Sequence, residues 1–116
     1  MLISLIAPIN NEEKNIQLLT EQIDAVMHNN NYNYELILVN DGSKDRSLSI
    51  IKEQAILFPQ IRYISFSRNF GKESAMIAGL NAARGDCAVI LDADFQHPPE
   101  RIPEMIHYYE EGYNQV

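Results

Sequence analysis

The feature that most constrains the fold is an alternation of apolar runs with segments of helical periodicity. The apolar runs are LISLIA, YELILV, IRYISF and CAVILD, at residues 2–7, 34–39, 61–66 and 87–92. They are nearly continuous in apolar residues, which is typical of parallel strands that are covered on both faces. Because strand–helix alternation leads to right-handed crossovers, the sequence predicts an α/β domain with a mostly parallel sheet.

Four helices are predicted between and after these strands, so we expect a Rossmann-like sheet with helices on both faces. Asn10 and Glu13 resemble a capping box, Ser43 is a candidate N-cap, and Gly85 is a candidate C′ residue. The third helix is rich in alanine, which lets a helix pack close to a sheet. The predicted helices span residues 11–28, 44–58, 72–84 and 99–111.

Length, charge and cysteine content limit the classes of protein that this chain represents. It has 116 residues, a net charge of −7 and one cysteine, Cys87. One domain over residues 1–116 fits this length, and the acidic balance argues against general binding of nucleic acid or anionic membranes. No apolar stretch approaches the roughly 20 residues of a membrane span. A single cysteine in an apolar run favours a buried thiol and a cytoplasmic protein.

The last residues, EEGYNQV, resemble a helix stop at Gly112 followed by the start of another strand. We therefore expect the chain to be the N-terminal part of a longer protein.

Polar residues follow every predicted strand. The four strand ends read PINNEE, NDGSKD, SRNFGK and DADFQH. In open α/β sheets, ligands bind outside the carboxyl ends of the strands. The four polar ends are therefore expected to build one crevice.

Two of these ends have both a structural and a functional interpretation. Asp41 is followed by Gly42 and Ser43, as in many turns, but its carboxylate also suits a base N–H or a ribose hydroxyl. Arg68 and Lys72 flank the start of the third helix. Cations and backbone N–H groups at a helix start attract phosphate, whereas surface charges of this kind are often only solvated. Arg62 is interpreted as an ordinary surface arginine.

Asp92 and Asp94 give the sharper signal. Residues at positions i and i+2 of an extended segment face the same way, so both carboxylates are offered to one ligand. Hard oxygen donors suit Mg²⁺ or Mn²⁺, in a site completed by phosphate and water. Gln96 lies two residues further on and is a candidate for a third ligand. The alternative is a loop start with acids that cap a helix.

Taken together, these motifs resemble those of family 2 inverting glycosyltransferases with the GT-A fold. The branch that the chain resembles most is that of the polyprenyl-phosphate sugar transferases, such as dolichyl-phosphate mannosyltransferase. The resemblance runs from Ile3 to about Glu104. It is carried by PINNEE, LILVNDGSKD, SFSRNFGKESAMIAGLNAARGD and VILDADFQHPPE.

The resemblance implies a role for each matching residue. It implies that Asp41 recognises the base and that Asp92 and Asp94 hold the ribose and diphosphate through Mg²⁺ or Mn²⁺. One departure is Asn10, where the family usually has Tyr or Phe, so stacking on the base is weakened. The other matching residues are Pro8, Asn11 and Glu12 in the nucleotide pocket, Arg68 and Lys72 near the nucleotide sugar, and Gln96 on the metal.

The resemblance also implies the reaction partners. The donor is expected to be a UDP- or GDP-linked sugar, and the acceptor a lipid phosphate or a glycan. The general base and the acceptor site are expected beyond residue 116, so no catalytic base is assigned and the chain alone is expected to be inactive in transfer. A full-length protein with such an acceptor is expected at the cytoplasmic face of the membrane.

Three other classes share parts of this pattern. In a haloacid-dehalogenase-like phosphatase the D-x-D motif opens the domain, whereas here it closes the fourth strand–helix unit. Receiver-like signalling modules carry their acids after the first and third strands, whereas here they follow the second and fourth. A nucleotide-binding module without turnover remains an alternative for the isolated chain.

Overall fold

The computed structural model describes residues 1–94 and 99–110, with only the backbone described for 108–110. Its strands are β1 (Leu2–Ile9), β2 (Asn33–Asn40), β3 (Ile61–Ser65) and β4 (Cys87–Ile90). Its α-helices are α1 (Ile16–Asn29), α2 (Ser47–Leu57), α3 (Lys72–Ala82) and α4 (Ile102–Glu110), and the 3₁₀ helix η1 (Pro99–Arg101) precedes α4. The strands and helices alternate as predicted.

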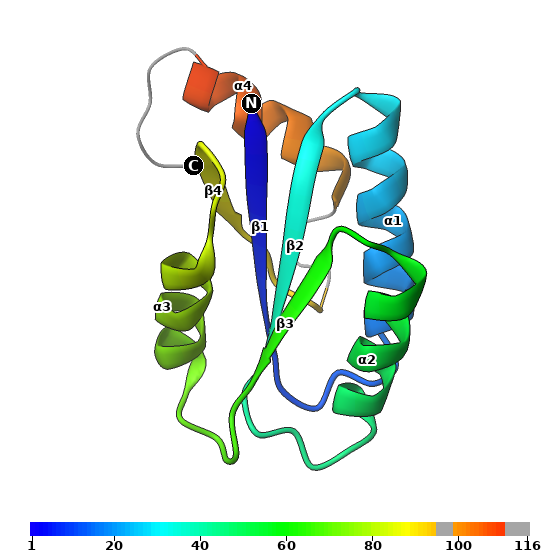
Figure 1. Cartoon of the computed structure of the whole chain (residues 1–116), viewed down its shortest axis with the longest axis vertical. Coiled ribbons are helices and arrows are strands. Elements are labelled where there is room, and N and C mark those ends of the chain that lie inside the picture. The colour runs from blue at the N-terminus through cyan, green and yellow to red at the C-terminus, as the bar shows by residue number, and fades with distance from the viewer. Residues whose placement is uncertain (95–98, 111–116) are drawn as a thin grey trace.

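The described strands form one parallel sheet in the order β3-β2-β1-β4 (Figure 1). β1 pairs with β2 along its whole length, from Leu2 opposite Asn33 to Ile9 opposite Asn40. On its other side β1 pairs with β4, from Ile3 opposite Cys87 to Ile6 opposite Ile90. The strand order therefore reverses direction between β1 and β4, and the prediction of a parallel α/β sheet is confirmed.

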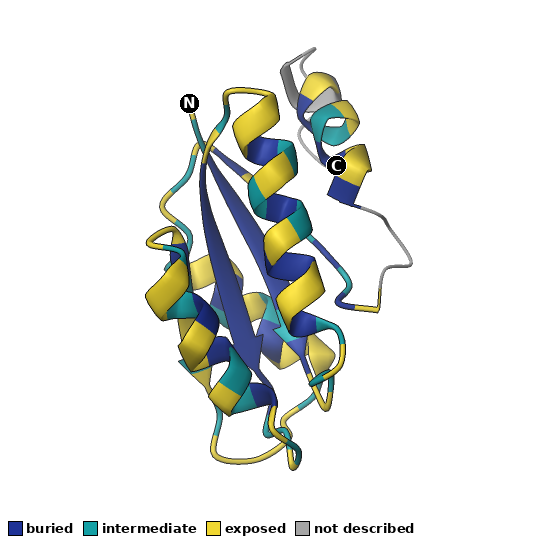
Figure 2. Cartoon of the chain, turned by 90° about the vertical axis from the view of Figure 1, so that its right-hand side faces the viewer, coloured by how far each residue is buried: buried dark blue, intermediate teal, exposed yellow. Residues whose placement is uncertain are grey.

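Helices cover both faces of this sheet, as predicted, but unequally. On one face, Ile3 and Leu5 of β1 pack with Ile16, Leu19 and Ile23 of α1, and α2 and α4 join the same core. Only α3 covers the other face among the described residues. Figure 2 shows the buried strands behind helices that carry their exposed residues on the outside.

Small residues let α3 lie close to the sheet. Ala75 is fully buried against Ile6, Ile37 and Val39. A Cβ atom at Gly79 would lie 2.4 Å from Cγ2 of Ile6, so no side chain fits there unless the side chain of Ile6 moves. The predicted close packing of the alanine-rich helix is confirmed.

Two helices begin later than predicted. α1 begins at Ile16, five residues after the predicted start, and no capping box forms, because the Asn10 amide donates to the Asp41 carbonyl. α2 begins at Ser47, whose N–H donates to Asp45 Oδ1, so Ser43 is not its N-cap. In both cases the polar residues before the helix hold a loop.

The end of α3 also differs from the prediction. The helix ends at Ala82, and Gly85 donates its N–H to Ser4 Oγ instead of acting as a C′ residue. Beside it lies a buried polar cluster, in which the Glu35 carboxylate accepts bonds of 2.6 Å from Ser4 Oγ, Arg84 N–H and Arg62 Nη1.

This cluster corrects the interpretation of Arg62 as an ordinary surface arginine. The Arg62 guanidinium lies 2.6 Å from the Glu35 carboxylate, and it also donates to the Ala82 carbonyl at 3.0 Å. Arg62 therefore joins β3 to β2 and to the end of α3. The prediction of a buried thiol is confirmed, since Cys87 is buried and desolvation raises the pKa of its thiol.

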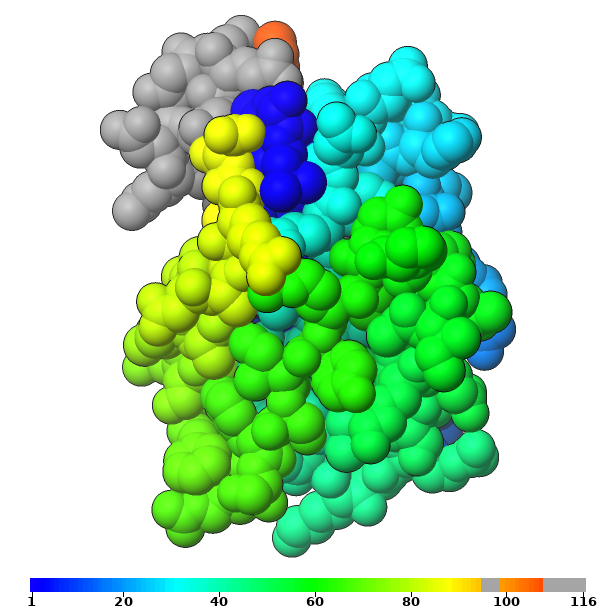
Figure 3. Space-filling view, viewed as in Figure 1, coloured from blue at the N-terminus to red at the C-terminus, as the bar shows by residue number. Residues whose placement is uncertain are grey.

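The loops that follow β2 and β3 meet at the rim of the molecule drawn at the bottom of Figure 3. Gly42 has a φ of +64°, and a Cβ there would lie 2.2 Å from the backbone of Arg68 and Asn69. The contact between these loops is thus a contact of two backbones. Within the described residues, no helix has the length and apolar character needed to cross a membrane.

Candidate nucleotide-binding site

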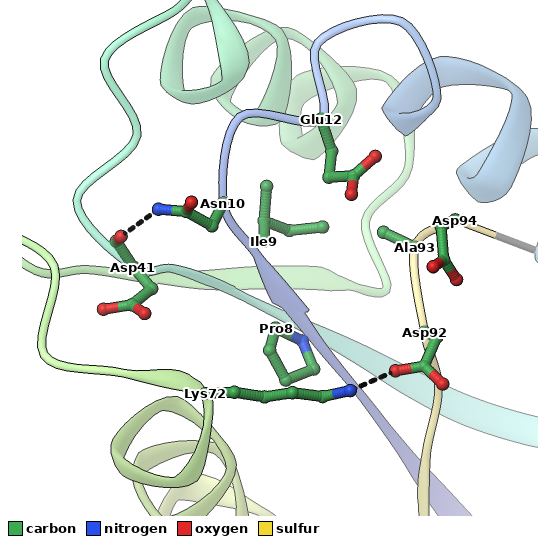
Figure 4. A pocket seen from close by; sticks show the side chains of 9 residues that line it. All are labelled: Pro8, Ile9, Asn10, Glu12, Asp41, Lys72, Asp92, Ala93 and Asp94. Carbon is green, nitrogen blue, oxygen red and sulfur yellow. Dashed lines mark hydrogen bonds and ion pairs between the residues drawn. The ribbon is translucent and has the colours of Figure 1, made fainter.

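A pocket lies at the carboxyl end of the sheet, where β1 and β4 are neighbours. In an open α/β sheet this is the point at which the strand order reverses, and the loops on either side separate to leave a crevice. Figure 4 shows the side chains around it. The lining residues are Pro8, Ile9, Asn10, Glu12, Asp41, Lys72, Asp92, Ala93 and Asp94.

The end of β1 contributes Pro8 to the lining, and the loop that follows contributes Glu12. This loop is held by the loop after β2. The Glu12 N–H donates to Ser47 Oγ at 3.0 Å, and the Asn11 N–H donates to Ser43 Oγ at 3.0 Å. Asn11 has a φ of 54° and its amide oxygen accepts from Lys44 N–H, so it holds the loop and is absent from the pocket lining.

Asp41 lies directly after β2 and is only 4% exposed. Its Oδ1 accepts from the Phe70 N–H at 2.7 Å and its Oδ2 from the Gly71 N–H at 3.1 Å. Two backbone donors that precede α3 are thus already bound to this carboxylate. They are not free for phosphate, which corrects the expectation of free N–H groups at this helix start.

Arg68 lies in the same loop but does not line the pocket. Its guanidinium carbon lies 4.7 Å from the centre of the Phe70 ring, a cation–π contact. The Phe70 ring meets the Phe66 ring edge to face, with 5.6 Å between the centroids. Arg68 is therefore held against its own loop.

Lys72 is the first residue of α3 and extends across the pocket beneath Pro8 (Figure 4). Its Nζ lies 2.6 Å from Oδ1 of Asp92. The hydrogen bond to Asp92 raises the pKa of Lys72, and the charges of Asp92 and Asp94 act in the same direction against partial desolvation. The pair connects the start of α3 to the segment after β4.

The segment after β4 presents its two aspartates as predicted. The carboxylates of Asp92 and Asp94 line the pocket, whereas Leu91 and Ala93 are 2% and 4% exposed and belong to the core, with Ala93 also bordering the pocket. The alternation of acid and apolar residue thus continues past the last residue of β4. The prediction for Gln96 falls outside the described residues.

A comparison with known protein families accounts for this combination of fold and polar strand ends. The family model described as "Glycosyl transferase family 2" matches residues 4–116.

The chain belongs to glycosyl transferase family 2.

Two curated relatives extend this assignment. A protein of Bacillus subtilis (strain 168) named "Uncharacterized glycosyltransferase YkcC" is 46% identical over 113 residues, which cover 97% of this chain and 35% of the relative. The "Undecaprenyl-phosphate 4-deoxy-4-formamido-L-arabinose transferase" of Photorhabdus laumondii is 43% identical over 116 residues, covering 98% and 35% respectively. The chain thus spans about a third of the length of these relatives.

A solved structure of similar fold is the mannosyltransferase PcManGT from Pyrobaculum calidifontis, in complex with GDP-Man and Mn²⁺. It is 26% identical to this chain, with a TM-score of 0.67. The superposition covers 85% of this chain and 29% of the mannosyltransferase. The predicted GT-A fold of this glycosyl transferase family 2 chain is confirmed.

The charge of the pocket bears on which ions a glycosyl transferase family 2 site of this kind can accept. The described lining includes four carboxylates, those of Glu12, Asp41, Asp92 and Asp94, and one ammonium, that of Lys72. A diphosphate would be repelled from such a lining unless cations accompanied it. The pocket therefore suits a nucleotide that arrives with a divalent cation better than a bare anion.

The donor atoms fit a shared metal site better than a complete one. No group of three or more His, Cys, Asp or Glu side chains in the described part of the chain is arranged to hold a metal. Asp92 and Asp94 together offer two hard carboxylates on one side of the pocket. Mg²⁺ is commonly bound by one or two carboxylates with substrate phosphates, and Mn²⁺ accepts the same donors.

Three lining residues had no predicted binding role: Ile9, Asn10 and Ala93. Ile9 and Ala93 are adjacent to predicted residues, so strand geometry gives a weak signal for them. The sequence indicates a role for Asn10 only as a candidate capping residue and as a departure from the family. In the structure its amide donates to the Asp41 carbonyl at 2.6 Å, so it supports the loop that carries the acid.

Proposed function

We propose that the chain provides the nucleotide-sugar-binding part of an inverting glycosyltransferase that transfers a sugar from a UDP- or GDP-linked donor to polyprenyl phosphate. The observation that carries the proposal is the convergence of Asp41, Lys72, Asp92 and Asp94 on one pocket between β1 and β4. Family membership supports the reaction class. The undecaprenyl-phosphate transferase among the relatives supports the kind of acceptor.

In this proposal the two sides of the pocket hold different parts of the donor. Asp41, on the side of the β2 loop, accepts a hydrogen bond from the base. Pro8, Asn11 and Glu12 form the wall and loop beside it. The aspartates on the β4 side hold the ribose and the diphosphate, and Lys72 balances the negative charge of the donor. Arg68 would add to this balance only after leaving the Phe70 ring, because it lies outside the pocket lining.

The proposed metal site uses Asp92, Asp94 and Gln96 with oxygens of the diphosphate. When Mg²⁺ or Mn²⁺ is bound there, it neutralises the charge that develops on the leaving diphosphate. The carboxylates of the chain orient the diphosphate so that its bond to the anomeric carbon faces the acceptor. The mannosyltransferase of similar fold, which binds GDP-Man and Mn²⁺, supports this use of a divalent cation.

A phosphate acceptor makes small demands on general-base catalysis, because it is already ionised at neutral pH. The proposed acceptor is a lipid, so the full-length protein is proposed to act at the cytoplasmic face of a membrane. We place the acceptor site and any catalytic base among residues beyond 116.

Calorimetry of UDP and GDP, each with and without Mn²⁺, tests the proposal on the wild type and on Asp94→Asn. We expect one of the two nucleotides to bind more tightly with Mn²⁺, and metal and nucleotide to strengthen each other by the same factor. Asp94→Asn keeps the shape but removes a charge. It should abolish the metal dependence while sparing the free nucleoside.

Asp24→Asn is the matched control, because Asp24 accepts a hydrogen bond from the Tyr34 hydroxyl away from the pocket. It should retain the metal dependence of the wild type. Equal affinities for the wild type in every condition would contradict the proposed metal-assisted binding.

A further inference from the structure

The ammonium group of Lys72 is paired with Asp92, a carboxylate that the proposed metal site also requires. The ammonium contacts Oδ1 of Asp92 at 2.6 Å and lies close enough to Asp94 for that charge to act on it. It is the only cation among the described lining residues, against four carboxylates. Figure 4 shows the chain of Lys72 spanning the pocket from α3 to Asp92.

An ammonium and a divalent cation cannot share this carboxylate without strong repulsion. Two cations of charge +1 and +2 a few ångströms apart repel each other even at high dielectric constant. The side chain of Lys72 is 62% exposed and that of Asp92 is 22% exposed. The lysine is therefore the partner that can leave, because its long stem is solvated and carries several rotatable bonds.

We propose that Lys72 is a resident counter-ion of Asp92 that is exchanged for the divalent cation when the nucleotide diphosphate binds. The inference rests on the proposed function and adds a step to it. In the free protein Lys72 neutralises Asp92 and competes with the metal. When metal and diphosphate bind together, the ammonium leaves Asp92 and pairs with a phosphate oxygen.

The exchange makes metal binding depend on the nucleotide. A metal ion alone must displace Lys72 with no new partner for the ammonium. A metal ion that arrives with a diphosphate brings that partner, so the displaced charge is paired again. Lys72 thus opposes binding of the metal alone and favours binding of the metal–diphosphate pair.

The exchange predicts opposite effects of removing Lys72 on metal binding and on nucleotide binding, which a phosphate-binding lysine away from Asp92 would not produce. Lys72→Met removes the ammonium and keeps much of the apolar stem. It should bind Mn²⁺ alone about threefold to tenfold more tightly than the wild type, in line with the loss of one exposed competing cation. In the presence of Mn²⁺ it should bind UDP or GDP at least fivefold more weakly.

The experiment measures Mn²⁺ binding by electron paramagnetic resonance without nucleotide, and then nucleotide binding by calorimetry with Mn²⁺. Lys72→Gln gives a second neutral variant of different shape, and thermal unfolding shows whether each variant is folded. Lys52→Met removes an exposed lysine of α2 outside the pocket and controls for the change in net charge. It should match the wild type in both measurements.

The outcomes separate the inference from the proposed function. If the wild type shows metal-coupled nucleotide binding and both Lys72 variants bind Mn²⁺ alone no more tightly, the counter-ion exchange is wrong and the proposed function stands. If the wild type binds no Mn²⁺ with or without nucleotide, the proposed function fails and the exchange fails with it. Opposite effects on metal and nucleotide, absent in Lys52→Met, support the exchange.

Discussion

The carboxylate of Asp41 accepts hydrogen bonds from the N–H groups of Phe70 and Gly71, one on each oxygen. An ionised carboxylate has about four acceptor positions in all. Two positions therefore remain after the loop has been held. A base N–H can use one of them, so the structural and the functional interpretation of Asp41 are compatible.

Asp41→Asn tests recognition of the base at the residue scale. The amide keeps one acceptor oxygen for the loop but loses the charge and half of the acceptor capacity. We expect binding of the free nucleoside to weaken by about 1.5–3 kcal/mol, the usual value of a hydrogen bond to a charged group. Calorimetry with uridine and guanosine measures the change.

Asp41→Ala tests the structural role of Asp41. It removes both loop contacts, so the free energy of unfolding should also fall, by about 1–3 kcal/mol. Asp24→Asn serves as the control for nucleoside binding. If Asp41→Asn binds nucleoside as tightly as the wild type, Asp41 only holds the loop and does not recognise the base.

At the scale of elements, the buried cluster around Glu35 fixes the end of α3 against three strands. Burial alone would raise the pKa of Glu35, but bonds from Ser4, Arg84 N–H and Arg62, with the charge of Arg62, hold it below its ordinary value of 4.5. A carboxyl group whose pKa is lowered by folding stabilises the protein above its unfolded pKa. This contribution is lost as the pH falls through the folded pKa.

Glu35→Gln should therefore lower the free energy of unfolding by about 1–3 kcal/mol at pH 7. The difference from the wild type should begin to shrink as the pH falls below about 4.5, where Glu35 of the unfolded chain takes up a proton. It should be lost only below the lowered pKa of the folded state, where both folded proteins carry a neutral group. Urea unfolding at pH 7, 5 and 3.5 measures it. Glu53→Gln, on the exposed side of α2, is the control and should show no comparable loss. A difference that does not depend on pH would contradict the role of the charge.

The positions of the strands and helices were predictable because apolar periodicity is a local signal. The starts of α1 and α2 were not predictable, because the side chains of Asn10, Ser43 and Asp45 form hydrogen bonds with partners about 30 residues away in the sequence. A capping pattern looks the same whether its side chains turn to the helix or to another loop. The same limit applies to Arg62, whose partner Glu35 lies on a neighbouring strand.

The site was predictable to the extent that strand ends determine it. Asp41 follows β2 directly, and Asp92 and Asp94 lie within four residues of the end of β4, so sheet topology brings all three to one edge. Asn11 and Arg68 lie further along their loops. There the side-chain direction depends on a left-handed backbone at Asn11 and on the Phe70 ring beside Arg68, and neither can be read from the sequence.

At the scale of the molecule, we expect this chain to bind the nucleotide without transferring the sugar. The chain spans about a third of the length of these curated relatives, and the acceptor site is proposed beyond residue 116. We therefore expect the 116-residue polypeptide to bind UDP or GDP with Mn²⁺ yet to transfer no sugar to polyprenyl phosphate. A radiolabelled-sugar assay with UDP- and GDP-linked donors measures transfer, and thermal shift with the nucleotides shows that the sample binds. Efficient sugar transfer by this polypeptide would contradict the proposal that the acceptor site lies beyond residue 116.

The pairing of β1 with β4 joins the first strand of the described sheet to the last. The pocket lies across this seam, with Pro8 on one side and Asp92 on the other, so it is incomplete until β4 has docked. We expect this long-range parallel contact to form late in folding, because a large loop must close before the contact is gained. A nucleotide that bridges the seam would thus act after the slow step of folding, leaving the folding rate unchanged while it slows unfolding. The donor would then make the native state kinetically more stable, in addition to serving as a substrate.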